Sequence, residues 1–334
     1  MPIDLSRIPK RLTDAAKTGT LIPFIGAGIS RSAVAGDSGA YPSWPELLKE
    51  LCKEACRKDL IRREEGEQID ELVDQHKYLM AAQALRSMLP KDEVTGIISR
   101  RFMLPDARPG PIHRSIFKLR PPLVITTNYD LLLEDAYAHE YRKQSLVLTY
   151  KEASNVQGLL QRHRLWQDRP IIFKIHGCAL DPSDAILSEM DYRNLLYRQP
   201  GYRLVLSAVF VTKVVLMLGF SFDDPELRLL MESLRDSMKY DSEPDYILLK
   251  RGEIRRVELR RWRDDFGLEA IEYDASPDYR EVLELIEHLA TFVPEAGTAA
   301  GATSGPAGGA KSGAAVAVRA PRGRRRSVAK TKGQ

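Results

Sequence analysis

The chain has 334 residues, of which 43% are hydrophobic and 29% charged, enough apolar material for the core of one large domain or two. No apolar stretch approaches the ~20 uncharged residues that span a bilayer, and segment 1–10 lacks the apolar core of a secretory signal, so we expect a cytoplasmic globular protein without membrane contact. Of the 50 basic and 46 acidic residues, eight basic and one acidic lie in 295–334, so the remainder is slightly acidic and lacks the charge of a nucleic-acid-binding domain.

The cysteine content excludes two kinds of site. The chain has three cysteines, with Cys52 and Cys56 four residues apart and Cys178 far along the chain. Three cysteines can build neither a disulfide framework nor the four-thiolate knuckle of a structural zinc. We therefore expect no zinc held by a four-cysteine knuckle.

Short apolar runs alternate with helical patterns along the chain. Each run is continuous, as expected for a strand that helices cover on both faces. This alternation predicts an α/β fold, a Rossmann-like doubly wound parallel sheet of about six strands. The predicted strands are residues 21–25, 122–126, 171–175, 214–218, 246–249 and 269–273.

A glycine-rich turn, Gly-Ala-Gly-Ile-Ser at 26–30, follows the first predicted strand. Its backbone can approach a ligand closely and offer N–H groups to a phosphate. Arg31 stands where a dinucleotide fingerprint usually has a third glycine, so the turn alone favours phosphate binding and a plain strand-to-helix turn equally. Ser30 either caps the next helix or bonds a phosphate oxygen.

About 95 residues separate the first two predicted strands, far more than the crossover of a βαβ unit needs. This segment must contain helices of its own, and we expect a helical lobe over about 44–119. Ser43 stands three residues before Glu46, with Pro45 in the first turn. This pattern predicts a capped helix over about 44–58 at the entry to the lobe.

Polar side chains stand at the ends of three later strands. Asn128 and Asp130 follow the second apolar run, His176 follows the third and Ser221 the fourth. Taken singly, Asp130 is a helix cap and His176 a side chain bonded to backbone. Because ligands of open α/β sheets bind outside the carboxyl ends of the strands, we expect these residues and the glycine turn to share one cleft.

The last part of the chain differs in composition. Residues 295–334 are mostly Gly, Ala, Ser, Pro and Arg and contain no aromatic residue, so they cannot bury enough surface to offset the entropy of ordering. We expect one folded domain over 1–294 and a disordered Gly/Ala/Arg-rich tail over 295–334. The basic run 322–326 either contacts nucleic acid or an acidic partner, or is a solvated end.

Four motifs in order resemble the NAD-binding signature of the sirtuin fold, over about residues 15–240. They are Gly-Ala-Gly-Ile-Ser at 26–30, Thr-Asn-Tyr-Asp at 127–130, Lys-Ile-His-Gly at 174–177 and Gly-Phe-Ser at 219–221. The resemblance is closer to the sirtuin-like NAD hydrolases of bacterial anti-phage defence. In that family a Pro-Ser-Trp segment such as 42–44 opens the helical insert, and Thr-Asn-Tyr-Asp replaces the Gln-Asn-x-Asp of deacylases.

The resemblance implies a role for each matched residue. Asn128 would hold the nicotinamide ribose and an attacking water, Asp130 would help to bind the carboxamide, and His176 would bond the ribose hydroxyls and act as general base. The other matched residues would form the rest of the NAD site, with the glycine turn against the pyrophosphate. They are Gly26, Ala27, Gly28, Ser30, Thr127, Gly219 and Ser221.

The departures from the sirtuin pattern point away from deacylation. Deacylating sirtuins carry a four-cysteine zinc knuckle and an Asp-Phe-Arg element after the glycine turn, and this sequence has neither. Hydrolysis of NAD needs a stabilised oxocarbenium-like transition state, a fixed water and a base with a pKa near neutrality. An imidazole, with an unperturbed pKa of ~6.5, suits that base, and no metal is needed because the cationic nicotinamide departs as a neutral molecule.

The resemblance therefore implies an NAD hydrolase (NADase) that releases nicotinamide and ADP-ribose and depletes cellular NAD in abortive infection. Such an activity must be gated. The resemblance accordingly implies a homo-oligomer, or an activating partner such as a HerA-type ATPase or an Argonaute-type sensor. Two alternatives stay open: an ADP-ribosyl or acyl transferase that uses the same NAD pocket, and a nucleotide-binding regulatory module without turnover.

Overall fold

The computed structural model describes residues 3–34, 36, 39–161, 169–220, 231–232, 243–276 and 278–295. Nearly all of them belong to one unit of the chain, Met1–Val293. Ser221 and the predicted disordered tail over 295–334, except for its first residue, lie outside the described residues. In the described ranges, no helix combines the length and the apolar composition that crossing a membrane requires.

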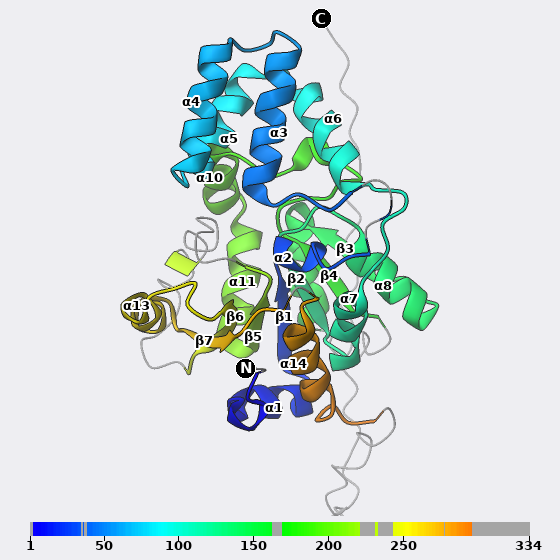
Figure 1. Cartoon of the computed structure of the whole chain (residues 1–334). Coiled ribbons are helices and arrows are strands. Elements are labelled where there is room, and N and C mark those ends of the chain that lie inside the picture. The colour runs from blue at the N-terminus through cyan, green and yellow to red at the C-terminus, as the bar shows by residue number, and fades with distance from the viewer. Residues whose placement is uncertain are drawn as a thin grey trace, which may run out of the picture. The chain divides into compact units, whose positions relative to one another are not determined.

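Seven parallel strands form one sheet in this part of the chain (Figure 1). They are β1 (Leu21–Ile25), β2 (Leu123–Thr126), β3 (Leu146–Thr149), β4 (Ile171–Lys174), β5 (Val214–Leu218), β6 (Asp245–Lys250) and β7 (Leu268–Tyr273). Their order is β3-β4-β2-β1-β5-β6-β7, so β1 lies between β2 and β5 and later strands are added on both sides of it. This arrangement confirms the predicted Rossmann-like, doubly wound α/β fold.

Strand β3 is the one strand of this sheet that the sequence pattern does not predict. It lies at the edge and pairs with β4 alone, from Leu146 opposite Ile171 to Thr149 opposite Lys174. Its residues are half-buried, and Val147 is 37% exposed. Because an edge strand is covered less than a central one, it needs no long apolar run, and four residues give only a weak signal.

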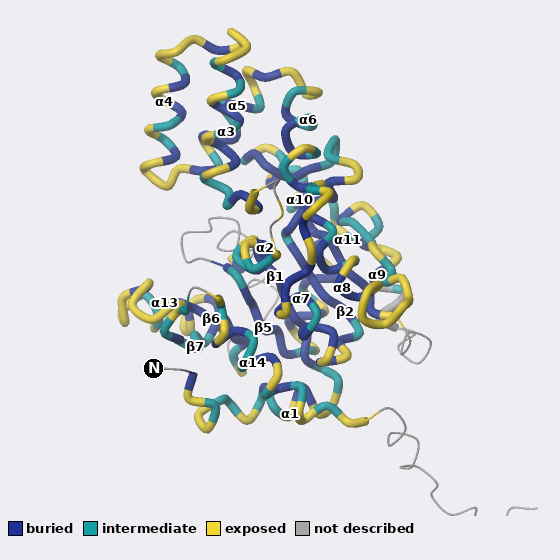
Figure 2. Tube along the Cα trace, turned by 45° about the vertical axis from the view of Figure 1, so that its right-hand side comes forward, coloured by how far each residue is buried: buried dark blue, intermediate teal, exposed yellow. Residues whose placement is uncertain are grey.

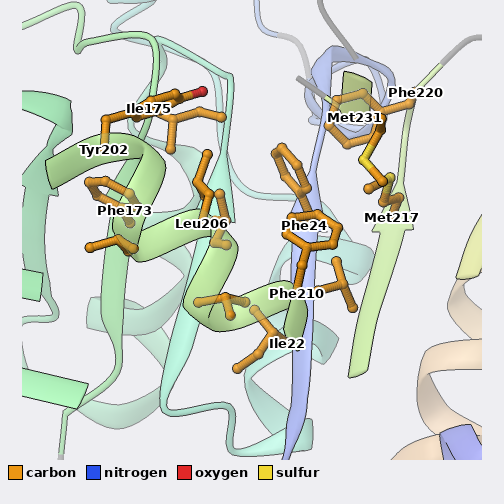
Figure 3. Close-up of a cluster of buried hydrophobic side chains, with 14 of the residues drawn as sticks. Ile22, Phe24, Phe173, Ile175, Tyr202, Leu206, Phe210, Met217, Phe220 and Met231 are labelled. Carbon is orange, nitrogen blue, oxygen red and sulfur yellow. The ribbon is translucent and has the colours of Figure 1, made fainter. Parts of the chain in front are cut away.

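Helices cover both faces of the sheet, and this is why its central strands are apolar throughout. All five residues of β1 are buried, and Figure 3 shows Leu206 and Phe210 of one covering helix near Ile22 and Phe24. One face packs against α9 (Ala153–Gln161), α10 (Glu189–Arg198), α11 (Pro200–Thr212) and α13 (Arg256–Phe266), and the other against α1 (Lys10–Thr18), α7 (Pro111–Ile116), α8 (Leu132–Tyr141) and α14 (Arg280–Ala290). Short 3-10 turns occupy Leu5–Arg7, Phe117–Leu119, Tyr150–Glu152 and Pro182–Asp184.

The predicted helical lobe lies above the sheet in Figure 1 and has a hydrophobic core of its own. Its first helix begins as predicted, because the Ser43 side chain accepts from the N–H of Glu46 and Glu46 Oε2 accepts from the N–H of Ser43 at 2.6 Å. Figure 2 shows the buried residues on the facing sides of the lobe helices and the exposed ones outside. The helices are α3 (Trp44–Arg57), α4 (Arg63–Asp74), α5 (Tyr78–Met88) and α6 (Lys91–Phe102).

Asp245, the first residue of β6, is a buried carboxyl whose charge depends on folding. Its Oδ1 accepts a hydrogen bond from the N–H of Val215 at 2.8 Å. Burial raises the pKa of this carboxyl to about 7, although that hydrogen bond and the charge of Arg11 act in the opposite direction. The pKa in an unfolded chain is ~3.9, so between the two values the folded state binds the extra proton. The stability that Asp245 contributes is therefore present at low pH and lost as the pH rises toward neutrality.

We expect Asp245→Asn to remove this pH dependence, because the amide is neutral at every pH and its oxygen can still accept from Val215. Between about pH 4 and pH 8, the free energy of unfolding of the parent should fall by at least about 1.4 kcal/mol more than that of the variant. This is the free energy that corresponds to a shift of one pKa unit. Urea unfolding at both pH values measures the difference. Asp14→Asn, at an exposed position of α1, is the matched control and should follow the parent. Equal pH dependence in all three proteins would contradict the raised pKa.

Candidate active site

A cavity of 430 Å³ lies at the carboxyl ends of the central strands, where the strand order reverses around β1. Of the nine predicted site residues that the structure describes, eight line this cavity, and Gly26 is the exception. Gly26 is buried beside it, and Ser221 lies outside the described residues. The eight are Ala27, Gly28, Ser30, Thr127, Asn128, Asp130, His176 and Gly219.

The glycine turn brings the ends of β1 and β5 into backbone contact. The N–H of Gly26 donates to the carbonyl of Leu218, and the N–H of Gly28 to that of Gly219, both at 2.8 Å. A Cβ atom on Gly26 or Gly28 would lie 2.7 or 2.8 Å from the Gly219 oxygen. The glycines are therefore needed for this close approach, and these two N–H groups are already engaged by backbone.

Among the glycines of this contact, Gly219 tolerates a side chain least. Its φ is +78°, and a Cβ atom there would lie 2.6 Å from the nitrogen of Ile29. We expect Gly219→Ala to lower the free energy of unfolding by more than the ~1–2 kcal/mol of a left-handed alanine, because the backbone must also move. Gly252→Ala is the matched control, with a φ of +77° and nothing within 4 Å of the added Cβ. Urea unfolding of both variants measures the difference, and equal losses would contradict the close approach.

A buried hydrogen-bond network joins the residues after β1 and β2. The Asn128 Nδ2 group donates to the carbonyl of Gly26 at 3.1 Å and to Ser30 Oγ at 2.8 Å. Ser30 Oγ donates in turn to Asp130 Oδ2 at 2.6 Å. Among the described residues, the buried Oδ1 of Asn128 has no hydrogen-bond partner. The network thus fixes the amide and leaves one acceptor for a hydroxyl or a water.

Ser30 differs from its simplest interpretation, and Asp130 has a second partner besides the start of α8. Ser30 lies inside the short helix α2 (Ala27–Ser30) and links Asn128 to Asp130, so the interpretation as a cap of the next helix is wrong. Asp130 accepts from the N–H of Leu132, the first residue of α8, at 3.0 Å while it also binds Ser30. Asp130 thus accepts from an N–H of the first turn of α8, from the position before the N-cap Leu131, and takes part in the site at the same time.

Lys174, the last residue of β4, supports the turn that carries Asn128 and Asp130. Its side chain is 1% exposed, and its Nζ donates to the carbonyl of Asp130 and, at 2.9 Å, to Glu134 Oε1. Burial disfavours the ammonium form, but the charges of Glu134 and Asp130 outweigh it and hold the pKa of Lys174 above its usual value. The lysine therefore stays charged, and its hydrogen bond to the carbonyl of Asp130 holds the turn after β2 in place.

His176 follows β4 and is 4% exposed. Its carbonyl accepts from the N–H of Ile186 at 3.0 Å, and its imidazole Nε2 lies 2.9 Å from the hydroxyl of Tyr192. His176 and Asn128 follow neighbouring strands, and both residues line the same cavity.

Sequence reasoning missed two parts of the cavity lining. Aromatic residues from the lobe form one part, and Trp44 and Tyr78 lie in contact there with ring centroids 5.7 Å apart. The last residues of β6 and β7 and residues that follow these strands form another part, and these carry most of its additional polar groups. Apart from Trp44, in the Pro-Ser-Trp segment at 42–44, no motif marks these residues. The packing of the lobe and of α14 and the positions of β6 and β7 in the sheet bring them to the cavity. The lining residues in question are Trp44, Tyr78, Phe102, Lys250, Glu253, Tyr273 and Tyr279.

Comparison with known proteins agrees with this fold. The profile of the SIR2-like domain family matches residues 122–271. NAD(+) hydrolase ThsA of Bacillus cereus is 28% identical over 236 residues, which are 71% of this chain and 44% of that protein. ThsA of Enterococcus faecium is 25% identical, with 75% of this chain and 47% of that protein covered. Defense-associated sirtuin 2 of Bacillus subtilis is 24% identical, and the match covers 83% of this chain and 26% of that protein.

The chain thus spans less than half the length of these three relatives. The matched segment includes the strand ends that carry Asn128, His176 and Gly219, and the parallel sheet is the one that the four motifs predict. Residues 122–271 are therefore similar to the SIR2-like domain family, and that segment contains the later part of the sheet and of the cavity lining.

Proposed function

We propose that the protein is an NAD hydrolase that cleaves the bond between nicotinamide and ribose and releases nicotinamide and ADP-ribose. The observation that carries this proposal is the meeting of Asn128 and His176 in one cavity, where Asn128 Oδ1 is buried without a partner among the described residues. The relatives named NAD(+) hydrolase support the same activity.

The roles follow from the chemistry of the bond. As the neutral nicotinamide leaves, positive charge develops on the ribose, and a water attacks the same ribose carbon and loses a proton to a base. Asn128 Oδ1 accepts from this water or from a ribose hydroxyl, His176 serves as the base, and Asp130 holds the amide through Ser30 and meets the carboxamide. The turn with Ala27 and Gly28 faces the pyrophosphate, and the residues after β6 face the adenosine.

The biological role belongs to the same proposal. The relative named defense-associated sirtuin supports a function in anti-phage defence, in which NAD depletion in the cytoplasm stops an infected cell. Because an ungated NADase would deplete the NAD of its own cell, we propose control by self-association or by an activating partner, such as a HerA-type ATPase or an Argonaute-type sensor.

Chromatography of the products tests the activity. Purified protein is incubated with NAD, alone and with candidate partners, and nicotinamide and ADP-ribose are measured. Release of both in equal amounts supports hydrolysis. ADP-ribose attached to protein would support a transferase instead, and saturable NAD binding without any product would support a regulatory module.

A further inference from the structure

Helix α10 carries a buried tyrosine that contacts the proposed base. The hydroxyl of Tyr192 lies 2.9 Å from Nε2 of His176 and 3.3 Å from Nδ1, and the two rings meet edge to face with centroids 5.2 Å apart. Tyr192 is 3% exposed. A phenol can donate or accept, so this hydroxyl can hold the imidazole in one orientation in either tautomer.

The helical lobe holds the first turn of the same helix. Oε1 of Gln83, on α5, accepts from the backbone N–H of Met190 at 3.0 Å, which is one of the N–H groups that a helix start leaves unpaired. Arg86, one turn further along α5, lies 3.7 Å from the carboxylate of Asp191. Figure 1 shows α10 directly below α5.

Local hydrogen bonds also join the residues at the start of α10, so these residues move together. The Ser188 side chain accepts from the N–H of Asp191, and Asp191 Oδ2 accepts from the N–H of Ser188 at 3.0 Å. Tyr192 is the next residue along the helix. A displacement of α5 that pulls on Met190 or Asp191 therefore moves the phenol that contacts His176.

We propose, on the basis of the function proposed above, that Tyr192 is a positioning residue for His176 and that the lobe controls it through Gln83 and Arg86. Tyr192 touches the imidazole and not the reacting atoms, so it acts on turnover through His176. A partner or a second copy of the chain that shifts α5 changes kcat without entering the cavity.

The phenol is tested first with Tyr192→Phe, which keeps the ring and removes the hydroxyl. We expect kcat for NAD hydrolysis to fall about tenfold, the effect of one well-placed hydrogen bond, and KM to change by less than about twofold. Tyr197→Phe makes the same change on the same helix at a site that is 78% exposed, and it should leave both constants unchanged. An unchanged or increased kcat in Tyr192→Phe would overturn the positioning role.

The link to the lobe is tested with Gln83→Met, which keeps the length of the side chain and removes its acceptor. We expect kcat to fall about threefold in the parent background and not at all in the Tyr192→Phe background, because both changes act through one contact. Gln75→Met, at an exposed position just after α4, is the control, since that side chain bonds Glu71 and not α10. Additive losses in the double variant would overturn the link.

A second measurement separates this inference from the proposed function. The chain has six histidines, so the Cε1–H signals of labelled protein can be resolved by NMR, and His176→Gln identifies the signal of His176. We expect Tyr192→Phe and Gln83→Met to move that signal even if the parent shows no turnover. Turnover with an unmoved signal would overturn the inference alone, whereas a moved signal without turnover would overturn the proposed function alone.

Discussion

Replacing His176 by alanine is expected to lower kcat for NAD hydrolysis by about 10² to 10⁴, the usual contribution of a general base. His176 is 4% exposed and lines the same cavity as Asn128, so no bulk water can take over its role without rearrangement of the site. The ring packs against Tyr192, so the variant loses some stability as well. Initial rates at saturating NAD, measured at a temperature where both proteins are folded, test the expectation.

The control for this variant is His139→Ala, which removes an imidazole at an exposed position of α8. It should hydrolyse NAD at the rate of the parent. Circular dichroism and thermal melting show whether His176→Ala is folded at the assay temperature. If folded His176→Ala turns over NAD like the parent, His176 is not the base, and the proposed site must be abandoned.

Replacing Lys174 by methionine is expected to lower the free energy of unfolding by about 3–5 kcal/mol, the cost of leaving one charge of a buried pair without its partner. The Lys174–Glu134 bond is 2.9 Å long, and its side chains are 1% and 15% exposed. The carbonyl of Asp130 also loses its donor, so the turn that carries Asn128 loosens. We therefore expect NAD turnover to fall together with stability, as measured by urea unfolding and initial rates.

An ion pair of the same length at the surface is the matched control. Lys118 lies 2.9 Å from Glu287, and these side chains are 48% and 49% exposed. Lys118→Met should cost no more than about 1 kcal/mol, because solvent screens the pair. In the double variant Lys174→Met and Glu134→Leu, part of the lost stability should return, since no unpaired charge stays buried. Equal losses for the two single lysine variants would show that burial of Lys174 does not matter.

The layers of the fold could be predicted from the sequence because central strands need apolar residues on both faces. The runs at 21–25, 171–175 and 214–218 therefore stand out, whereas the edge strand at 146–149 pairs on one side only and does not. The helix that begins at Trp44 was also predictable, since a capping box is a local pattern of a few residues.

The sequence also predicted that the site residues lie close together, because they follow strands of one parallel sheet. Carboxyl ends of parallel strands lie at one edge of a sheet, and β2 and β4 are neighbours in this one, so residues after 126 and 174 fall together. The motifs at 26–30 and 127–130 marked this edge. They did not reveal that Ser30 would join Asn128 to Asp130, because a hydroxyl at that position suits several partners equally well.

The sequence by itself determined the parallel sheet, the helical lobe and the edge of the sheet that carries the site. Apolar strands, helix caps and turns each depend on residues that are close together in the chain. Only the tertiary structure decided that Lys174 supports the turn of Asp130, that Tyr192 contacts His176, and that Gln83 of the lobe holds the same helix. Such contacts depend on where each helix lies and how it is rotated, and both follow from packing between residues that are far apart in the chain.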